Sequence, residues 1–277
     1  MTKTQVTKHD ILQKLTEVAA QLGPAAQDTL LSENLNKHAF EVKLILERCG
    51  HESRILDLGG GIGINLLCLR KLNHSLKLHL VDRFEKGQDG NRTGTTADGL
   101  RLMRDASISA ISQAFLKEPA LPFDAESCDV VTCLDVLDHL PGHPLKLLAE
   151  IHRVLKRDGA IIISGPNAVS LRTRLKLLAG KQPYIPFDLW CHDKYASYFR
   201  LYTRREFSRM LEMVGFTRVK TRMMLEPSNR RAKDRKGGFK GVVITALMWA
   251  IYFTTALVPG YRPAIYAVAR KPATLIS

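Results

Sequence analysis

A glycine-rich run restricts the fold of this chain more than any other feature of its sequence. It follows an apolar, strand-like segment, 55–58, and precedes a segment with the apolar spacing of a helix, 65–72. The run reads Asp57-Leu58-Gly59-Gly60-Gly61-Ile62-Gly63. Glycines at a strand-to-helix turn let a ligand approach the backbone closely, and the first turn of the helix offers unpaired N–H groups to an anion. A tight turn without a ligand is the alternative interpretation of this motif by itself.

A second acidic position favours the ligand. Asp82 ends the next predicted strand, twenty-five residues after Asp57. A carboxylate at the end of that strand can accept hydrogen bonds from both hydroxyls of a ribose. The pair therefore predicts a nucleoside-containing cofactor, but it fits a nicotinamide enzyme as well as a methyltransferase.

Strand-like and helix-like segments alternate after residue 50, which predicts an α/β fold with crossover helices and a parallel sheet. Two predicted helices, 8–22 and 25–49, come before this region, and a capping box at Thr203-Arg204-Arg205-Glu206 opens a later helix. The predicted strands are 55–58, 76–81, 108–115, 130–134, 160–164, 217–225 and 263–269.

Five segments, which include the glycine run and the strand that ends at Asp82, occur in a fixed order along the chain. They are ILDLGGGIG at 55–63, HLVD at 79–82, LPFDAESCDVV at 121–131, TCLDVLDHLP at 132–141 and EIHRVLKRDGAIIISGPN at 150–167. In this order they resemble the class I S-adenosylmethionine-dependent methyltransferases, specifically the small-molecule group that includes the ubiquinone and menaquinone methyltransferases. The resemblance covers roughly residues 35–225 and the last strand. It implies S-adenosylmethionine as cofactor and a Rossmann-like, doubly wound, seven-stranded sheet with helices on both faces.

The resemblance also implies roles for individual residues. The glycines of the turn would approach the methionine part of the cofactor, and Asp57 would help to hold its amino end. Asp82 would bind the ribose, and Asp135 would lie beside the sulfonium centre. The cofactor-binding residues that it implies are Asp57, Gly59, Gly61, Gly63, Asp82, Glu118, Leu121 and Asp135.

The adenine contact departs from the family's pattern. The family usually has an acidic residue four positions before Leu121, where this chain has Lys117, and Glu118 comes one position late. Either the loop is shifted so that Glu118 serves, or the backbone alone makes this contact.

Methyl transfer from a sulfonium is an in-line displacement, so the protein contributes positioning and needs a base only for an acceptor that carries a proton. His192 and His139 are the candidate catalytic residues. His192 lies in the aromatic-rich segment 181–199, which either lines a hydrophobic acceptor pocket or packs against the sheet. The ordinary alternative for His139 is to orient a loop at the end of a strand.

Charge is distributed unevenly over the 277 residues. The net charge is +14, and residues 166–277 hold twenty-one basic against six acidic side chains. Such a tail favours an anionic partner: lipid, nucleic acid or an acidic substrate.

The five cysteines contain no C-x-x-C pair, which argues against a disulfide framework or a metal site and fits a cytoplasmic protein. The N-terminus also lacks the apolar core of a signal peptide.

The least family-like part is an insertion before the last strand. A basic run, 230–240, precedes eighteen uncharged residues, 241–258. A single membrane crossing would put the last strand on the wrong side of the bilayer, so this apolar helix is expected to lie in a membrane interface, to dip and return, or to pack against protein. The basic run favours peripheral binding to an anionic membrane, and a dimer interface is the alternative.

These observations predict four regions. They are an N-terminal helical cap or lid (1–50), the cofactor-binding core (51–225) with an acceptor loop (168–200), the basic-apolar insertion (226–262), and the last strand with a tail (263–277). The expected function is methyl transfer to a small hydrophobic or lipid-linked acceptor at the inner face of a membrane. The alternatives are a soluble acceptor combined with a dimeric enzyme, an RNA methyltransferase, and a cofactor-binding scaffold without activity.

Overall fold

A single sheet organises the part of the chain that the computed structural model describes, which comprises residues 6–22, 34–84, 97–113, 119–140, 142–183, 200–225 and 253–273. Its seven strands follow the order β3-β2-β1-β4-β5-β7-β6. They are β1 (Arg54–Leu58), β2 (Lys77–Asp82), β3 (Ser109–Ser112), β4 (Cys128–Leu134), β5 (Leu155–Pro166), β6 (Thr217–Met224) and β7 (Ala264–Arg270). Strands β1 to β5 are parallel, and β7 runs antiparallel between β5 and β6. The predicted doubly wound, seven-stranded α/β fold is confirmed.

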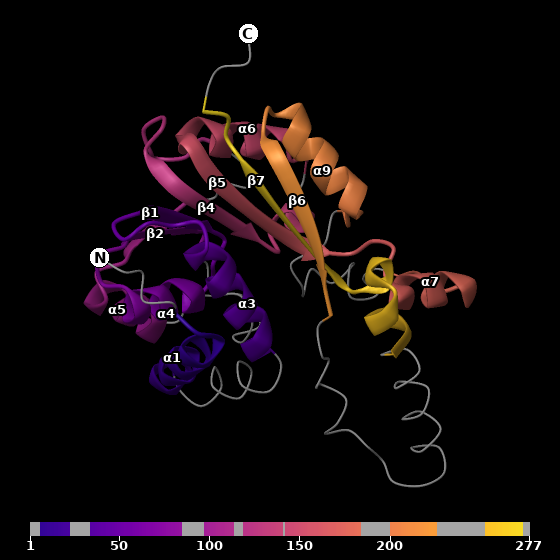
Figure 1. The fold of residues 1–277 in the computed structure, drawn as a ribbon, viewed down its shortest axis with the longest axis horizontal. Coiled ribbons are helices and arrows are strands. Elements are labelled where there is room, and N and C mark those ends of the chain that lie inside the picture. Colours follow the sequence, from indigo (N-terminus) through magenta and orange to yellow (C-terminus); the bar gives the residue numbers. More distant parts are fainter. Residues whose placement is uncertain are drawn as a thin grey trace, which may run out of the picture.

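Helices cover both faces of the sheet (Figure 1). They are α1 (Lys8–Gln21), α3 (Leu35–Leu46), α4 (Ile64–Leu72), α5 (Ala97–Asp105), α6 (Leu145–Val154), α7 (Leu171–Leu178) and α9 (Arg204–Met213). One face carries α1, α3, α4 and α5, and the other carries α6 and α9, whereas α7 lies beyond the end of the sheet.

The strand sequences explain this two-sided packing. Leu56 and Ile161 point into the core beneath α6 and α9, whereas their neighbours Ile55 and Ile162 point into the core beneath α1, α3 and α4. Because successive strand residues face opposite sides, a strand buried on both faces becomes a continuous apolar run.

Two helix starts follow the local sequence. The predicted capping box at Thr203 is present, with Glu206 N–H donating to Thr203 Oγ1 and Thr203 N–H to Glu206 Oε2. Thr7 and Asp10 form the same reciprocal pair at the start of α1. Each pair satisfies backbone N–H groups that a helix start leaves open.

Two predicted boundaries differ most from the structure. Strand β5 begins at Leu155 and not at residue 160, because Leu155 pairs with Cys128 before a register shift brings Ala160 opposite Val130. Residues 156–159, Lys-Arg-Asp-Gly, lack the apolar pattern of a buried strand, so the predicted strand starts after them. Helix α3 begins only at Leu35, and the earlier part of the predicted helix 25–49 lies mostly outside the described residues.

The topology fixes where a ligand can meet this sheet. Strands β2 and β3 lie beyond β1 on one side, and β5, β7 and β6 lie beyond β4 on the other, so the strand order reverses between β1 and β4. Open α/β sheets bind ligands at the carboxyl ends of the strands beside such a reversal. In the ranges that the structure describes, none of the helices combines the length and apolar content needed to cross a bilayer.

Candidate active site

The glycine turn joins β1 to α4 at the carboxyl end of the sheet. Gly59, Gly61 and Gly63 all have positive φ angles, of 71°, 56° and 71°. At position 60 a Cβ atom would lie 2.2 Å from Asp57 Oδ2, so only glycine fits there, whereas a Cβ at Gly61 would meet nothing within 4 Å. The turn is thus packed tightly on its inner side and open at Gly61, as close approach of a ligand to the backbone requires.

Asp82 holds this turn at the end of β2. Its Oδ2 accepts a hydrogen bond from Gly61 N–H at 2.8 Å, and its Oδ1 accepts one from Arg83 N–H at 2.6 Å. Asp82 is half-buried. A carboxylate oxygen can accept more than one hydrogen bond, so these contacts leave acceptor capacity for ligand hydroxyls. Sequence reasoning gave Asp82 a ligand role but not this second contact with the turn.

Asp57 is buried beneath the turn. Its partner is Thr132 of β4, whose Oγ1 donates to Asp57 Oδ1 at 2.5 Å across the paired strands. Burial raises the pKa of Asp57 to about 7; the Thr132 hydrogen bond opposes this rise, and the charges of Glu41 and Asp82 add to it. A positive charge brought to the turn would therefore lower the pKa of Asp57 and favour its ionised form.

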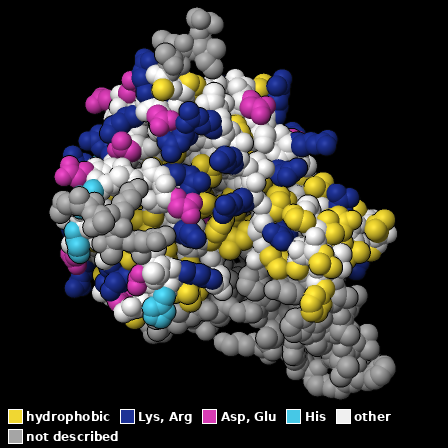
Figure 2. Space-filling view, viewed as in Figure 1, with side chains coloured by type: hydrophobic (Ala, Val, Ile, Leu, Met, Phe, Trp, Pro, Cys, Tyr) yellow, Lys and Arg dark blue, Asp and Glu magenta, His cyan; other side chains and the backbone are white. Residues whose placement is uncertain are grey.

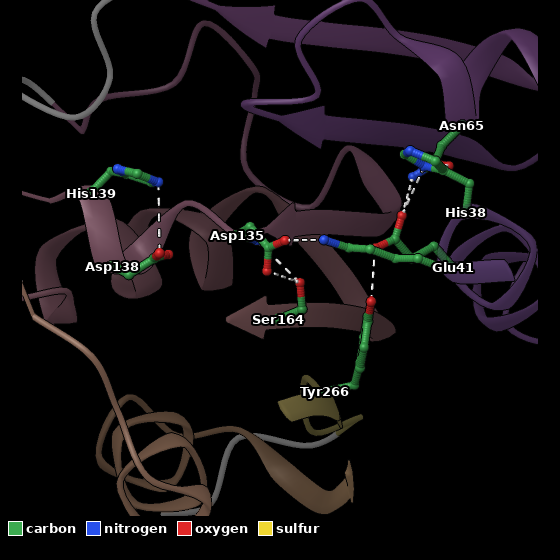
Figure 3. A network of polar contacts seen from close by, with 9 residues as sticks. His38, Glu41, Asn65, Asp135, Asp138, His139, Ser164 and Tyr266 are labelled. Atoms are coloured by element: carbon green, nitrogen blue, oxygen red, sulfur yellow. Dashed lines mark hydrogen bonds and ion pairs between the residues drawn. The ribbon is translucent and has the colours of Figure 1, made fainter. Parts of the chain in front are cut away.

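Asp135 follows β4 and has a positive φ of 53°. Ser164 of β5 donates from its Oγ to Asp135 Oδ1 at 2.9 Å, and Asp135 N–H donates to Ser164 Oγ at 3.1 Å. Lys37, from α3, forms an ion pair with Asp135 Oδ2. Three elements that are distant in the sequence therefore position this carboxylate (Figure 3).

A second group of polar side chains surrounds Glu41 of α3 (Figure 3). The buried Glu41 carboxylate accepts from Tyr266 Oη at 2.9 Å and from Asn65 Nδ2 at 2.9 Å, and His38 Nδ1 lies 3.2 Å from its Oε2. Burial by itself would raise the pKa of Glu41, but the contacts with His38, Lys37 and Asn65 lower it below the ordinary value. The network joins α3 to the first turn of α4 and to β7.

Asp138 lies in the short helix η2 (Leu137–His139). The residue is buried, and neither carboxylate oxygen has a hydrogen-bond partner among the described residues, although His139 Nε2 lies 3.6 Å from its Oδ2. Burial, and secondarily the charge of Asp135, raises the pKa of Asp138 to about 7. A buried carboxyl group without such a partner is costly once it ionises.

Leu121 is buried, and its loop is held by α6. Leu121 N–H donates to Glu150 Oε1 at 2.8 Å, and Arg153 Nη2 donates to the carbonyl oxygens of Leu121 and Phe123. Arg153 also pairs with Glu150. The loop that precedes β4 is therefore fixed by charge-assisted hydrogen bonds.

The structure places most of the predicted cofactor residues at the carboxyl edge of the sheet. The glycine turn, Asp82 and Asp135 all lie at the ends of β1, β2 and β4. Glu118 and His192 lie outside the described residues, as does most of the aromatic segment 181–199.

Sequence reasoning missed several residues that the fold brings to this region. They are Lys37, His38, Glu41, Asn65, Thr132, Ser164 and Tyr266. One signal was available, because Glu41 stands at helical spacing from the apolar Leu44 and Ile45 and therefore on the buried stripe of its helix. A carboxylate at such a position indicates buried partners.

These residues fit S-adenosylmethionine. The open backbone at Gly61 suits close approach, the acceptor oxygens of Asp82 suit a pair of ribose hydroxyls, and the carboxylate of Asp135 suits a neighbouring positive charge.

Comparisons with known proteins agree with this fit. A family described as a methyltransferase domain matches residues 30–221. A comparison with curated proteins finds no match.

Among solved structures, phosphoethanolamine N-methyltransferase 2 from Haemonchus contortus, in complex with S-adenosyl-L-methionine, is 18% identical with a TM-score of 0.59, and the alignment covers 98% of this chain and 58% of that one. A SAM-dependent methyltransferase from Archaeoglobus fulgidus is 16% identical with a TM-score of 0.55, over 88% of this chain and 97% of the other. A possible histamine N-methyltransferase from Thermotoga maritima is 14% identical with a TM-score of 0.54, over 94% and 99% of the two chains.

At these identities the likeness concerns the fold. Because the family match spans most of its length, the chain belongs to the methyltransferase-domain family, as a class I enzyme that uses S-adenosylmethionine as its cofactor.

Proposed function

We propose that this enzyme methylates a small hydrophobic or lipid-linked acceptor at the inner surface of a membrane. In this proposal the helices before residue 50 act as a lid, the acceptor binds above the carboxyl ends of β4 and β5, and the insertion 226–262 brings the enzyme to the bilayer. The protein would then be cytoplasmic and peripherally bound.

One observation carries the membrane part of the proposal: the apolar run ends beside the candidate site. Asn167, directly after β5, donates from its side chain to the carbonyl oxygens of Gly260 at 3.0 Å and Arg262 at 2.8 Å. Asn167 follows Ser164, which holds Asp135, by only three residues. A bilayer that receives the apolar run would therefore lie close to the place where the acceptor is methylated.

In this reaction the side chains of the protein bind and position the cofactor and the acceptor. When bound, S-adenosylmethionine supplies a methyl group on a positively charged sulfur. The turn, Asp57 and Asp82 hold the cofactor, Leu121 and Glu118 border its base, and Asp135 complements its charge. A hydroxyl acceptor also requires a base, for which we propose His192 or His139, since imidazole titrates near neutral pH.

The direct test is a methyl-transfer screen. Full-length protein and radiolabelled S-adenosylmethionine are incubated with organic and aqueous extracts of the source cell, and we expect the label in the organic fraction. Label confined to the aqueous fraction would contradict a lipid-like acceptor. The variants His192→Ala and His139→Ala, assayed across pH, then identify the base, since loss of the base lowers turnover most where an imidazole would be neutral.

A soluble amine is the second candidate acceptor. Asp135 and the buried Asp138 place two carboxyl groups near the end of β4, where a cationic acceptor would share Asp135 with Lys37. Two of the similar structures are, by name, a phosphoethanolamine and a possible histamine N-methyltransferase. In this case the apolar insertion would form a dimer interface, and the labelled product would be an aqueous amine. An RNA acceptor has weaker support, because the basic run 230–240 lacks interleaved aromatic residues apart from Phe239.

A further inference from the structure

Helix α7 is amphipathic in the opposite sense to an ordinary surface helix. Its buried side carries hydroxyl groups, with Ser170 Oγ of the N-cap 2.9 Å from Thr173 Oγ1. Its outward side carries leucines, of which Leu177 is 58% and Leu178 is 85% exposed. A helix at a water-exposed surface normally turns its apolar stripe inward, so this arrangement indicates that something other than water meets the outer side.

A second exposed apolar segment lies beside α7. It is the described end of the insertion, where residues 253–257 are helical and Leu257 is 81% exposed. The Arg174 guanidinium of α7 lies over the Tyr261 ring, 5.5 Å from its centroid, and Arg262 donates to the carbonyl oxygens of Thr255 and Ala256. With the Asn167 contacts, these interactions fix the two segments against each other.

Together the two segments form one apolar surface, which we call the α7 face. Of the large hydrophobic side chains that are exposed in the described parts of the chain, all but Val6 and Met213 belong to it. It consists of Val169, Leu175, Leu177, Leu178, Phe253, Leu257 and Val258. Figure 2 shows hydrophobic side chains gathered on this side of the molecule, with basic side chains next to them. A contiguous exposed patch of this kind marks an interaction site.

The charged side chains of the described residues on the two segments of the α7 face are all basic. Arg172, Arg174, Lys176 and Lys181 lie on or directly after the helix. The sequence has no Asp or Glu from 159 to 187 or from 235 to 277. Within the described residues of the two segments that form it, the α7 face therefore carries basic and no acidic side chains. Such a surface complements a bilayer that contains anionic lipid, because hydrophobic insertion and attraction to the headgroups then act together.

We propose that the α7 face docks on an anionic lipid bilayer, as a contact separate from the basic run at 230–240. Helix α7 begins seven residues after Ser164, so docking through it holds the carboxyl edge of the sheet against the membrane. The inference deepens the proposed function and rests on it for the lipid-like acceptor, but the docking itself is measured without an acceptor.

The test is cosedimentation of full-length protein with vesicles of phosphatidylcholine, either pure or containing about 30% phosphatidylglycerol. We expect binding to the anionic vesicles that weakens between about 0.05 M and about 0.5 M NaCl as the charges are screened. The double variant Leu177→Asp, Leu178→Asp should lower the bound fraction by about ten-fold or more, because carboxylates would enter the interface. Its affinity for S-adenosylmethionine should stay within about two-fold of the wild type, since neither leucine touches the turn.

Met213→Asp is the matched control. Met213 is 57% exposed at the end of α9 and lies outside the α7 face, so this variant should bind vesicles like the wild type. If the double variant folds poorly, Arg172→Gln with Lys181→Gln replaces it and should weaken binding at low salt and flatten the salt dependence.

Several outcomes would overturn the inference. Vesicle binding by the leucine variant equal to that of the wild type would assign docking to 230–252 alone and leave the proposed function intact. A wild-type protein that ignores both vesicles, or a dimer that the leucine variant dissociates, would make the α7 face a protein interface. A different result separates the two proposals: an aqueous labelled product, with vesicle binding that the leucine variant loses, would support the docking surface and refute the lipid-like acceptor of the proposed function.

Discussion

At the scale of single residues, the buried carboxyl group of Asp138 makes the stability of this enzyme depend on pH. Its pKa in the folded protein is about 7, against 3.8 for the unperturbed group, because of burial and the charge of Asp135. The folded state therefore holds a proton that the unfolded state has lost, and stability falls as pH rises from about 4 to about 7.

We expect Asp138→Asn to remove much of this pH dependence. Relative to the wild type, the free energy of unfolding of the variant should be about 2 kcal/mol higher at pH 8 than at pH 5, so the variant is relatively more stable at pH 8. Urea unfolding at the two pH values measures the difference directly, and an equal effect of the substitution at both would show that Asp138 is ionised throughout.

In the proposed cofactor site, the carboxylate of Asp82 would bind the ribose in addition to accepting from Gly61 N–H. Asp82→Ala should weaken S-adenosylmethionine binding by about 100-fold or more, because two charge-assisted hydrogen bonds to a ribose are lost and Gly61 N–H loses its acceptor. Titration calorimetry measures the change. Asp105→Ala, which removes an exposed carboxylate from α5, is the control and should leave the affinity unchanged.

At the scale of secondary-structure elements, the Glu41 network fixes α3 to the sheet. Tyr266→Phe should lower the free energy of unfolding by about 1–3 kcal/mol, since the buried Glu41 loses a donor while the ring still packs edge-on against Phe40. Tyr202→Phe is the matched control, because Tyr202 is also buried but the structure shows no hydrogen bond from its hydroxyl to the described residues. Equal losses for the two variants would mean that the hydroxyl of Tyr266 contributes nothing through Glu41.

At the scale of the whole molecule, the insertion is a long connection between two strands that are already neighbours. Met224 of β6 pairs with Ala264 of β7, so the sheet constrains only the ends of the segment between them. A variant with 230–252 replaced by a short Gly-Ser linker should keep its thermal midpoint within a few degrees and its cofactor affinity within about two-fold, because closing a loop costs free energy that grows only slowly with its length. Loss of cofactor binding would show that the insertion helps to build the site.

The alternation of strands and helices, the glycine turn and the capping box are local patterns, and each was predicted correctly from the sequence. Asp82 and Asp135 could be placed for the same reason, since each directly ends a strand and parallel strands bring such ends to one edge. The boundary of β5 was predicted less well, because the pairing of Leu155 with Cys128 depends on a partner strand and not on the polar residues that follow it.

The sequence by itself thus determined the fold class and the edge of the sheet at which the glycine turn, Asp82 and Asp135 meet, because backbone periodicity and turn chemistry act over a few residues. Only the tertiary structure decided that Lys37 meets Asp135, that Tyr266 meets Glu41 across 225 positions of sequence, and that the leucines of α7 face outward. Contacts between distant positions are set by how the layers pack, and no local pattern encodes which side chain a helix will present to a strand far along the chain.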